Sequence, residues 1–336
     1  MTRILDLFSI FESLARPTVP AGGAGYFSAH LIPGFENHRL GKDGDGAPAV
    51  LISVRDFATR ARPSPIVLEN LTVHHDVHCR IKRGDEPLEE GRFTVLRCTG
   101  EDTAIHLHFL RIASPLVMLV GVNPTRTEVS LLIDSLVELF RVINEAPRKS
   151  VQGLWAEVFL ISGANSPEDL VDAWHVVPQD RYDFNAGSFR IEVKSATGRS
   201  RHHYFSLEQL YPPMGSKLIV ASVFVERTGG GTSLGDLVNM TRERLAGNVR
   251  LVAYIDRIVF QSLGSGWRRA LDERFDLELA KESLAFFDPS QVPRLSQEVP
   301  VGISEVRFRS DFSGRLPIET QELESEGGLF RAALRK

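Results

Sequence analysis

Three carboxylates and one lysine between residues 153 and 210 have the types and spacing that metal-assisted chemistry needs. Ser188–Ser195 alternates apolar and polar residues, so a strand there puts Glu192 and Lys194 on one face. Asp183 precedes Glu192 by nine residues, and the turn signal Asn185-Ala186-Gly187 lets the two carboxylates face each other across a hairpin. Such a pair repels unless a cation lies between the two groups, and Mg²⁺ prefers oxygen ligands. A lone Glu-x-Lys pair on a strand is usually a solvated ion pair, and the neighbouring acids are what favour a site.

Glu157 is the third acid near this pair. It is the only charged residue between Lys149 and Glu168. In a helix over this segment, Leu154 and Ile161 mark the apolar stripe, and Glu157 falls inside the stripe. Burying an unpaired carboxylate costs free energy, so Glu157 is either a core acid with a partner or a group that points into the metal site. The sequence leaves both interpretations open.

The same stretch carries a series of short motifs. They are Gly153-Leu154-Trp155-Ala156-Glu157, Trp174, Asp183-Phe184, Glu192-Val193-Lys194-Ser195 and His203-Tyr204-Phe205-Ser206-Leu207-Glu208-Gln209-Leu210. The series resembles the PD-(D/E)XK nuclease superfamily, and within it the bacterial proteins called "putative PD-(D/E)XK family member" that occur in restriction and phage-defence gene clusters. One departure is that no proline directly precedes Asp183. Asp180, just after Pro178, is therefore the fallback for that ligand position.

The resemblance implies an α/β fold with a restriction-endonuclease-like αβββαβ core. Its elements would be a helix with Glu157, a strand at Ala173–Val177, strands with Asp183 and Glu192, a helix with Gln209, and the strand Lys217–Val225. The last segment is apolar without a break, which is typical of a strand that is buried on both faces.

The resemblance also assigns roles to these side chains. Asp183 and Glu192 would hold a divalent cation, Mg²⁺ with Mn²⁺ as a substitute, and the carbonyl of Val193 would be a further ligand. The cation would neutralise the scissile phosphate and acidify a bound water. Lys194 would orient that water, and Glu157 would bind a second cation or hold the water network.

Gln209 and His203 would contact DNA or support the metal ligands, although an exposed helix position is the alternative for Gln209. The implied function is a metal-dependent DNA endonuclease of a restriction or phage-defence system. DNA is then the partner, together with a helicase/ATPase or methyltransferase of the same system, and cleavage of two strands favours a homodimer. The main alternative is a non-cutting DNA- or protein-binding scaffold subunit of a defence complex.

The chain divides into three predicted regions. Residues 1–146 form an N-terminal β-rich domain with a linking helix, residues 147–228 form the nuclease core, and residues 229–336 form a helical and β extension packed on the core. The candidate strands of the antiparallel N-terminal region are Ala49–Val54, Ile66–Leu68, Thr72–Ile81, Arg92–Cys98 and Ala104–His108. A sugar- or small-molecule-binding β protein would fit residues 48–122 but would leave Glu157 unexplained.

The clearest predicted helix is Thr125–Ala146, which opens with a capping box and is followed by Pro147. The N-terminal 47 residues are expected to hold a short amphipathic segment and loops, among them a polar loop at His38–Gly46. The acidic tail with Glu319 and Glu326 is expected to be mobile. Arg148-Lys149, just after the helix, is either a phosphate contact or a solvated turn.

A second metal hypothesis concerns a histidine-rich strand. His74, Asp76 and His78 share one face of the predicted strand, and His106 and His108 complete a site if their own strand lies beside it. Ligands at every second position of one strand rarely close a tetrahedral site, so a polar strand face is the competing interpretation.

The composition indicates a cytoplasmic protein with no membrane span. The chain has 336 residues, 43% of them hydrophobic, and two cysteines, which do not make a disulfide framework. No apolar run is expected to reach the roughly 18–20 residues that span a bilayer. The net charge of −4 does not indicate nucleic-acid binding, so a nuclease with this sequence needs local basic patches or a partner that delivers DNA.

Overall fold

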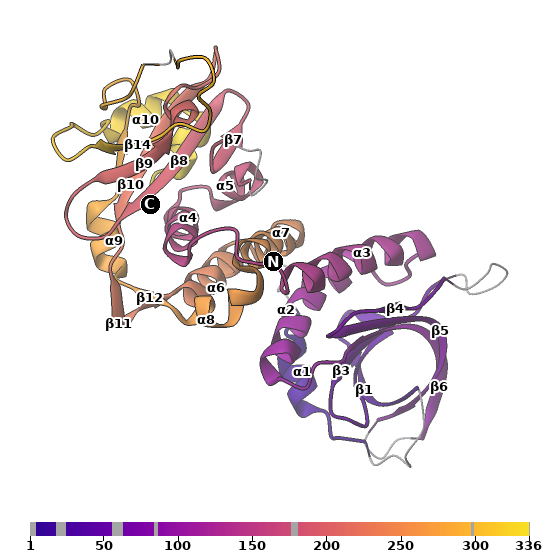
Figure 1. Cartoon of the computed structure of the whole chain (residues 1–336). Helices are drawn as coiled ribbons and strands as arrows, with labels where there is room; N and C mark the ends of the chain where they lie inside the picture. The colour runs from indigo at the N-terminus through magenta and orange to yellow at the C-terminus, as the bar shows by residue number, and fades with distance from the viewer. Residues whose placement is uncertain are drawn as a thin grey trace. The chain divides into compact units, whose positions relative to one another are not determined.

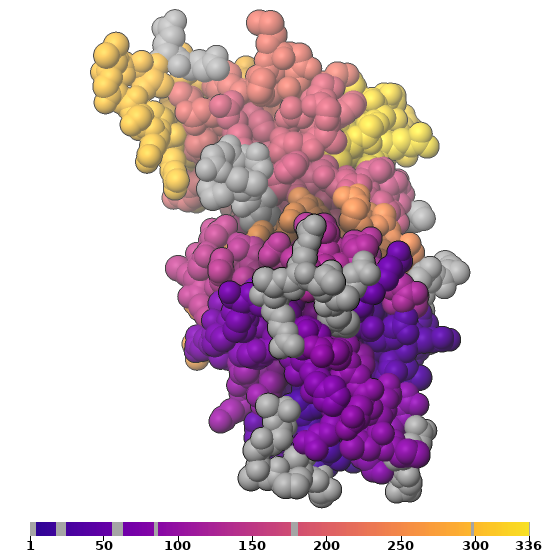
Figure 2. All heavy atoms as spheres, turned by 90° about the vertical axis from the view of Figure 1, so that its right-hand side faces the viewer, coloured from indigo at the N-terminus to yellow at the C-terminus, as the bar shows by residue number. Residues whose placement is uncertain are grey.

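The computed structural model describes residues 5–17, 25–55, 63–83, 87–175, 181–296 and 299–335. The chain is a mixed α/β protein that divides into two compact units. The first unit is Met1–Glu145 with Ala246–Asp256, and the second is Ala146–Leu245 with Arg257–Lys336. Figures 1 and 2 show the first unit in indigo to magenta and the second in pink to yellow, apart from the orange segment 246–256.

A six-stranded sheet dominates the first unit, with the strand order β1-β2-β3-β6-β5-β4. The strands are β1 (Tyr26–Ile32), β2 (Phe35–Lys42), β3 (Pro48–Ile52), β4 (Ile66–Val67), β5 (Leu71–Lys82) and β6 (Glu89–Cys98). Neighbours are antiparallel, but β1 also pairs with β5 in parallel, which closes the sheet into the ring seen in Figure 1. Closure leaves the ring strands without a free edge.

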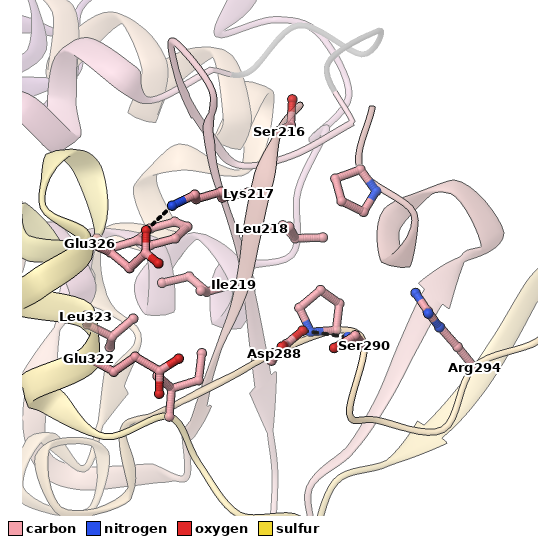
Figure 3. Close-up of a pocket in the computed structure, with 14 residues that line it drawn as sticks. Ser216, Lys217, Leu218, Ile219, Asp288, Ser290, Arg294, Glu322, Leu323 and Glu326 are labelled. Carbon is pink, nitrogen blue, oxygen red and sulfur yellow. Dashed lines mark hydrogen bonds and ion pairs between the residues drawn. The ribbon is translucent and has the colours of Figure 1, made fainter. Parts of the chain in front are cut away.

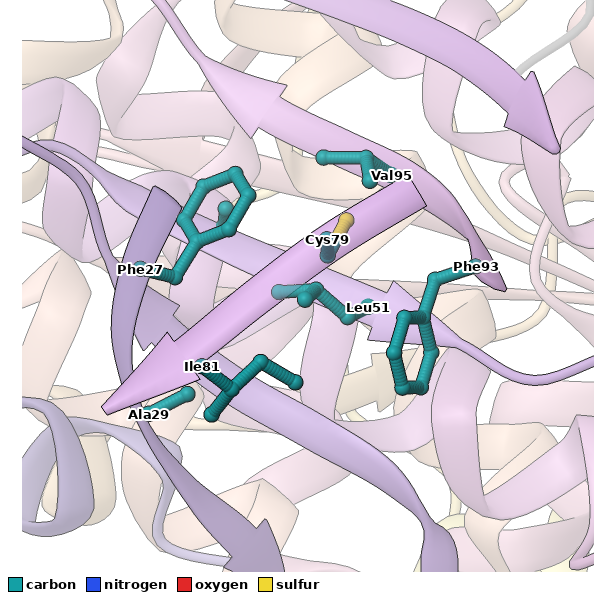
Figure 4. Close-up of a cluster of buried hydrophobic side chains, with 8 residues drawn as sticks. Phe27, Ala29, Leu51, Cys79, Ile81, Phe93 and Val95 are labelled. Atoms are coloured by element: carbon teal, nitrogen blue, oxygen red, sulfur yellow. The ribbon is translucent and has the colours of Figure 1, made fainter. Parts of the chain in front are cut away.

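Apolar side chains from alternate positions fill the ring. Phe27, Leu51, Cys79, Ile81 and Phe93 point inward from four strands (Figure 4). These positions are at most 5% exposed, so the ring is a packed core and not a ligand cavity. Cys79 and Cys98 are both free thiols.

Strands β1 and β2 were not predicted, and the polar loop expected at His38–Gly46 is reduced to the turn at 43–46, because His38–Lys42 belong to β2. The segment lacked a clear alternation because a polar residue, His38, is buried on the outer face of β2, opposite Ile52, whereas the neighbouring Leu51 points into the ring. Its ring nitrogens contact the carbonyl oxygen of Gly121 at 2.8 Å and the amide of Ser53 at 3.3 Å, which satisfies the buried imidazole.

The predicted strand Ala104–His108 is also wrong, because these residues lie in helix α2 (Thr103–Val120), whose N-cap is Asp102. Ile105, Phe109 and Ile112 are buried on one helical face. The prediction failed because the five residues Ala104–His108, taken alone, fit the helical period and the strand period equally well. This helix is long and apolar enough to cross a membrane, contrary to the expectation that no run reaches that length, but 56% of it is buried inside the protein, as in a core helix.

The other helices of the first unit follow their end signals. They are α1 (Leu7–Ser13), α3 (Arg126–Val142) and the start of α7 (Val249–Leu263). The capping box of Thr125 and Glu128 is present at the start of α3, which confirms that prediction. The helix ends four residues earlier than expected, at Val142.

The second unit has a four-stranded sheet with the order β13-β10-β8-β7 (Figure 1). The strands are β7 (Phe184–Ala186), β8 (Phe189–Ala196), β10 (Lys217–Phe224) and β13 (Ala285–Phe287). β7 and β8 form a hairpin, and β8 and β10 run parallel over their whole length. The other strands of this unit form two antiparallel two-stranded ribbons. They are β9 (His202–Ser206) with β14 (Arg307–Asp311), and β11 (Arg227–Ser233) with β12 (Arg274–Phe275).

Helices pack on this sheet and on one another. They are α4 (Val151–Gly163), α5 (Pro167–Ala173), η1 (Leu207–Leu210), α6 (Leu234–Arg244), η2 (Gly264–Gly266), α8 (Trp267–Asp272), α9 (Leu277–Ser283), α10 (Thr320–Glu326) and α11 (Gly328–Ala333). The last two replace the expected mobile tail, because Leu323, Leu329 and Phe330 are buried.

The predicted αβββαβ order is met only in part. The strand expected at Ala173–Val177 is reduced to one antiparallel bridge between Trp174 and Phe184, because Ala173 ends α5 and residues 176–180 lie outside the described ranges. The helix expected around Gln209 is the short 3-10 helix η1, and β9 before it pairs with β14 and not with the central sheet. The detailed core topology therefore stays a prediction.

Candidate active site

Strand β8 positions the Glu-x-Lys pair. Glu192 and Lys194 stand opposite Val220 and Ser222 of the parallel strand β10. This face is not the solvated surface on which a lone Glu-x-Lys pair usually lies, since the side chains of Glu192 and Lys194 are 4% and 18% exposed. The Lys194 ammonium lies 2.6 Å from Glu192 Oε1 and 4.9 Å from the ring centroid of Phe205, which fix its position.

Asp183 comes to this pair through the β7–β8 hairpin. The register pairs Phe184 with Ile191, so one step further places Asp183 opposite Glu192. The turn that joins the strands is Gly187-Ser188, where Gly187 has φ +54°, slightly later than the expected Asn185-Ala186-Gly187. The backbone N–H of Val193 donates to Asp183 Oδ2 at 2.9 Å, which ties the carboxylate to β8.

Glu157 reaches the same region from helix α4. It lies in the unbroken buried run Leu154–Ile161, and its own side chain is 5% exposed. The indole N–H of Trp174 donates to Glu157 Oε2 at 2.7 Å. Trp174 is held in turn by the bridge to Phe184, the residue next to Asp183.

Lys149 joins two of these acids, and sequence reasoning missed it. Its ammonium lies 2.6 and 2.7 Å from the two oxygens of Glu157 and 3.0 Å from Asp183 Oδ1. Neither a phosphate contact nor a solvated turn describes this side chain, which is 23% exposed. The one available signal was that a buried Glu157 needs a cationic partner.

Gln209 links the third acid, Glu192, to the end of strand β9. Its amide donates to Glu192 Oε1 at 2.7 Å, and its Oε1 accepts from the Lys194 ammonium at 3.3 Å and from the Ser206 amide at 3.1 Å. The exposed-helix alternative for Gln209 is therefore wrong. Gln209 orients both members of the Glu-x-Lys pair.

The ionisation of the acids follows their surroundings. Burial raises the pKa of Glu157 to about 8, with repulsion by Asp183 adding to it against the pull of Lys149. Burial likewise raises the pKa of Glu192 to about 7, although Lys194 opposes this. Burial also acts to raise the pKa of Asp183, but Lys149 and the Val193 amide outweigh it and hold the pKa below its usual range.

Three carboxylates here face two ammonium groups, so one negative charge is left over when all five groups are ionised. Burial is the main reason that the pKa values of Glu157 and Glu192 are raised, and repulsion by Asp183 adds to it, so ionising all three acids is costly here. Added positive charge would relieve it, and carboxylate oxygens suit a hard divalent cation. The donor chemistry of Asp183 and Glu192 therefore fits the implied metal.

The predicted three-carboxylate metal cluster is not present as such. Within the described ranges, no group of three or more His, Cys, Asp or Glu side chains is arranged to hold an ion. The reason is that Lys149 lies between Glu157 and Asp183, so these acids meet an ammonium and not each other. Asp180, the fallback ligand, lies outside the described residues.

His203 does not contact DNA directly, because it is only 2% exposed. Its Nε2 lies 2.7 Å from Ser222 Oγ, and its ring packs edge-on against Phe312. Burial, with Lys194 nearby, lowers the pKa of His203 to about 3, so the ring is neutral. Ser222 lies opposite Lys194 in the β8–β10 pairing. His203 therefore contacts the strand residue next to Lys194 and does not reach solvent.

The histidine-strand metal hypothesis fails. A bulge between His74 and Val77 breaks the alternation, and Asp76 has φ +54° and binds Arg92 through both carboxylate oxygens. His106, which was to complete the site, lies in α2.

The second unit also has a cavity of about 360 Å³ that contains none of the predicted site residues. Lys217 and Glu326 form an ion pair at one side of it, and Arg294 lies opposite (Figure 3). Arg294 is already engaged, since it donates to the Leu210 carbonyl oxygen and stacks over Tyr211. This cavity mixes both charge signs and is not part of the candidate site.

Comparison with known protein families identifies the family to which the chain is similar. Residues 9–313 match the model of the family described as "Putative PD-(D/E)XK family member" (DUF4420). No curated protein and no solved structure matches the chain. The matched range includes Glu157, Asp183, Glu192 and Lys194 and most of the chain. The chain therefore belongs to this PD-(D/E)XK family.

Proposed function

We propose that this protein is a metal-dependent endonuclease that hydrolyses phosphodiester bonds of DNA in a restriction or phage-defence system. The observation that carries the proposal is the buried Glu192-Val193-Lys194 strand with Asp183 opposite it across a hairpin. Buried acids with shifted pKa values that meet at one place are typical of functional sites. The cytoplasmic location, the homodimer and a helicase/ATPase or methyltransferase partner remain parts of this proposal.

Asp183 and Glu192 would hold the divalent cation, Mg²⁺ or Mn²⁺. When bound, it supplies charge neutralisation at the scissile phosphate and a more acidic water. Lys194, paired with Glu192, would orient the attacking water, while Gln209 keeps both side chains in place. Trp174 and the Val193 amide fix Glu157 and Asp183, so that the acids do not reorganise during the reaction.

The β9–β14 ribbon offers DNA a path to this site. Residues directly opposite each other on an antiparallel pair share a face, and the register pairs Tyr204 with Arg309 and Ser206 with Arg307. Tyr204 is 67% exposed, and the Arg309 guanidinium lies 5.9 Å from its ring centroid. The backbone N–H of Ser206 donates to Gln209 Oε1, so the ribbon ends beside the site, and its opposite face packs Phe205 against Lys194. The basic and aromatic face supplies the local patch that a net charge of −4 requires.

This ribbon gives a binding prediction. Tyr204→Ala and Arg309→Gln should each weaken DNA binding about fivefold or more, because an aromatic stack on a base contributes roughly 1–3 kcal/mol. Fluorescence anisotropy with labelled oligonucleotides, in EDTA, measures binding without cleavage. Lys281→Gln is the matched control, since it removes an exposed cation that forms an ion pair with Glu278 along α9. Equal affinities of all four proteins would exclude the ribbon as the DNA path.

The nuclease itself is tested with purified protein and supercoiled plasmid. Nicked or linear product should appear with Mg²⁺ or Mn²⁺ and should not appear with EDTA. Because the full system is expected to include a partner, the assay is repeated with the products of the neighbouring genes. Absence of metal-dependent cleavage under both conditions would contradict the proposal.

The second candidate function is a non-cutting scaffold. Lys149 and Lys194 offset two of the three carboxylate charges without any metal, which is how a site that has lost its chemistry could persist as an ionic core. The two functions differ in one measurement, because a scaffold binds DNA or protein but gains no stability from divalent cations.

A further inference from the structure

We infer that Lys149 is a built-in cation that occupies the place of a second metal ion, so that the nuclease centre takes one divalent cation per chain. This inference rests on the proposed function and deepens it. It concerns Glu157, whose role the sequence left open between a core acid and a ligand of a second ion.

The contacts of Lys149 carry the argument. An ammonium group has three protons, and Lys149 has three carboxylate acceptors within 3.0 Å: both oxygens of Glu157 and Oδ1 of Asp183. All of its hydrogen-bonding capacity is therefore used inside the site. Lys149 has no proton left for a phosphate or a water, so its function is to supply positive charge between the two acids.

The surroundings fix the ammonium at this point. The amides of Arg148 and Lys149 both donate to the Ser262 carbonyl oxygen, at 2.9 and 3.2 Å, which anchors the backbone just before α4. Glu157 is held independently by Trp174, and Asp183 by the Val193 amide. The two carboxylates thus have their orientation from neutral donors and would keep it without the lysine.

The same geometry suits a metal ion if the ammonium is removed. Oxygens of Glu157 and Asp183 converge on one point at 2.6–3.0 Å. Mg²⁺ binds oxygen at about 2.0–2.1 Å, so the carboxylates would need to close by less than about 1 Å. In sites with two metal ions the cations share a bridging ligand and lie about 3.5–4 Å apart. Asp183, opposite Glu192, is the group placed to be shared.

The test counts Mn²⁺ ions on the full-length protein by calorimetry and by the electron paramagnetic resonance signal of free Mn²⁺. Wild type should bind one ion per chain. Lys149→Met keeps the length of the side chain without its charge and should bind two. Lys149→Arg keeps the charge and should bind one. The double variant Lys149→Met/Glu157→Gln removes one charge of each sign and should again bind one, because it lacks the Glu157 ligand.

The outcomes separate the inference from the proposed function. Wild type that binds no Mn²⁺ contradicts the metal site of the proposed function. If wild type and Lys149→Met each bind one Mn²⁺ ion per chain, or if wild type binds two, the inference is overturned and the proposed function is not affected. If Lys149→Met is unfolded without metal, millimolar Mn²⁺ should restore its folded circular-dichroism spectrum. Failure of that rescue, while the double variant folds, overturns the inference too.

Discussion

Lys194→Ala should abolish DNA cleavage, with a loss of about 10²–10³-fold, while folding and DNA binding persist. The expected loss is that of removing one preorganised charged group from a reacting centre. Folding should survive because the partner, Glu192, already has a pKa of about 7 and can take up a proton when the ammonium is gone. DNA binding should survive because Lys194 is 18% exposed and lies under the ribbon, not on its exposed face.

The measurement compares plasmid-cleavage rates with anisotropy and melting temperature for the same preparations. Lys281→Ala is the control, since Lys281 is a more exposed lysine that forms an ion pair with Glu278 in the same helix. Cleavage by Lys194→Ala at the wild-type rate would end the proposed role of this residue. An equal loss in the control would show that the assay reports on general charge and not on the site.

The part of the site that was predictable from the sequence is the part made by local patterns. The alternation of Ser188–Ser195 correctly placed Glu192 and Lys194 on one face, and the expected hairpin brings Asp183 opposite Glu192, with its turn at Gly187-Ser188. Both depend on residues a few positions apart, where strand period and turn chemistry decide the geometry. Continuous apolar character likewise located β10.

Lys149 could not be found in this way, because its two partners are 8 and 34 residues away and in different elements. A single lysine after a helix has no periodic context that separates a buried ion pair from a surface charge. His38 shows the opposite failure: a polar residue that is buried on the outer face of the β ring hides a strand that apolar patterning cannot reveal. Longer-range pairing decided both cases.

The buried lysines change one stability expectation. If only the three mutually repelling acids of the sequence are considered, the double change Asp183→Asn with Glu192→Gln is expected to stabilise the metal-free protein or leave its stability unchanged. With Lys149 and Lys194 present, neutralising both acids leaves two ammonium groups with one carboxylate, which reverses the sign of the excess charge. The two acids must therefore be changed one at a time.

Asp183→Asn and Glu192→Gln should shift the metal-free stability in opposite directions. The pKa of Asp183 is held below its usual range, so its ionised form stabilises the fold, and Asp183→Asn should cost on the order of 3 kcal/mol as the loss of one partner in a buried ion pair. The pKa of Glu192 is raised to about 7, so the folded state binds its proton more tightly than the unfolded chain does. Its ionisation therefore costs stability increasingly between about pH 4.5 and pH 7. Above pH 7 the full cost is present, and a shift of 2.5 pH units corresponds to about 3 kcal/mol as an upper bound.

Glu192→Gln should consequently match wild type near pH 5 and exceed its melting temperature at pH 8, while Asp183→Asn lies below wild type at pH 8. Mn²⁺ should raise the melting temperature of wild type, because at a hundred times its dissociation constant it adds about 2.7 kcal/mol to the free energy of unfolding. It should have no effect on the melting temperature of either variant. Scanning calorimetry from pH 5 to pH 8, with and without Mn²⁺, measures both effects. A Glu192→Gln protein that is less stable than wild type at pH 8 would show that the Lys194 pair outweighs the burial of Glu192. An unchanged Mn²⁺ response in both variants would remove Asp183 and Glu192 as metal ligands, and with them the chemistry proposed for this centre.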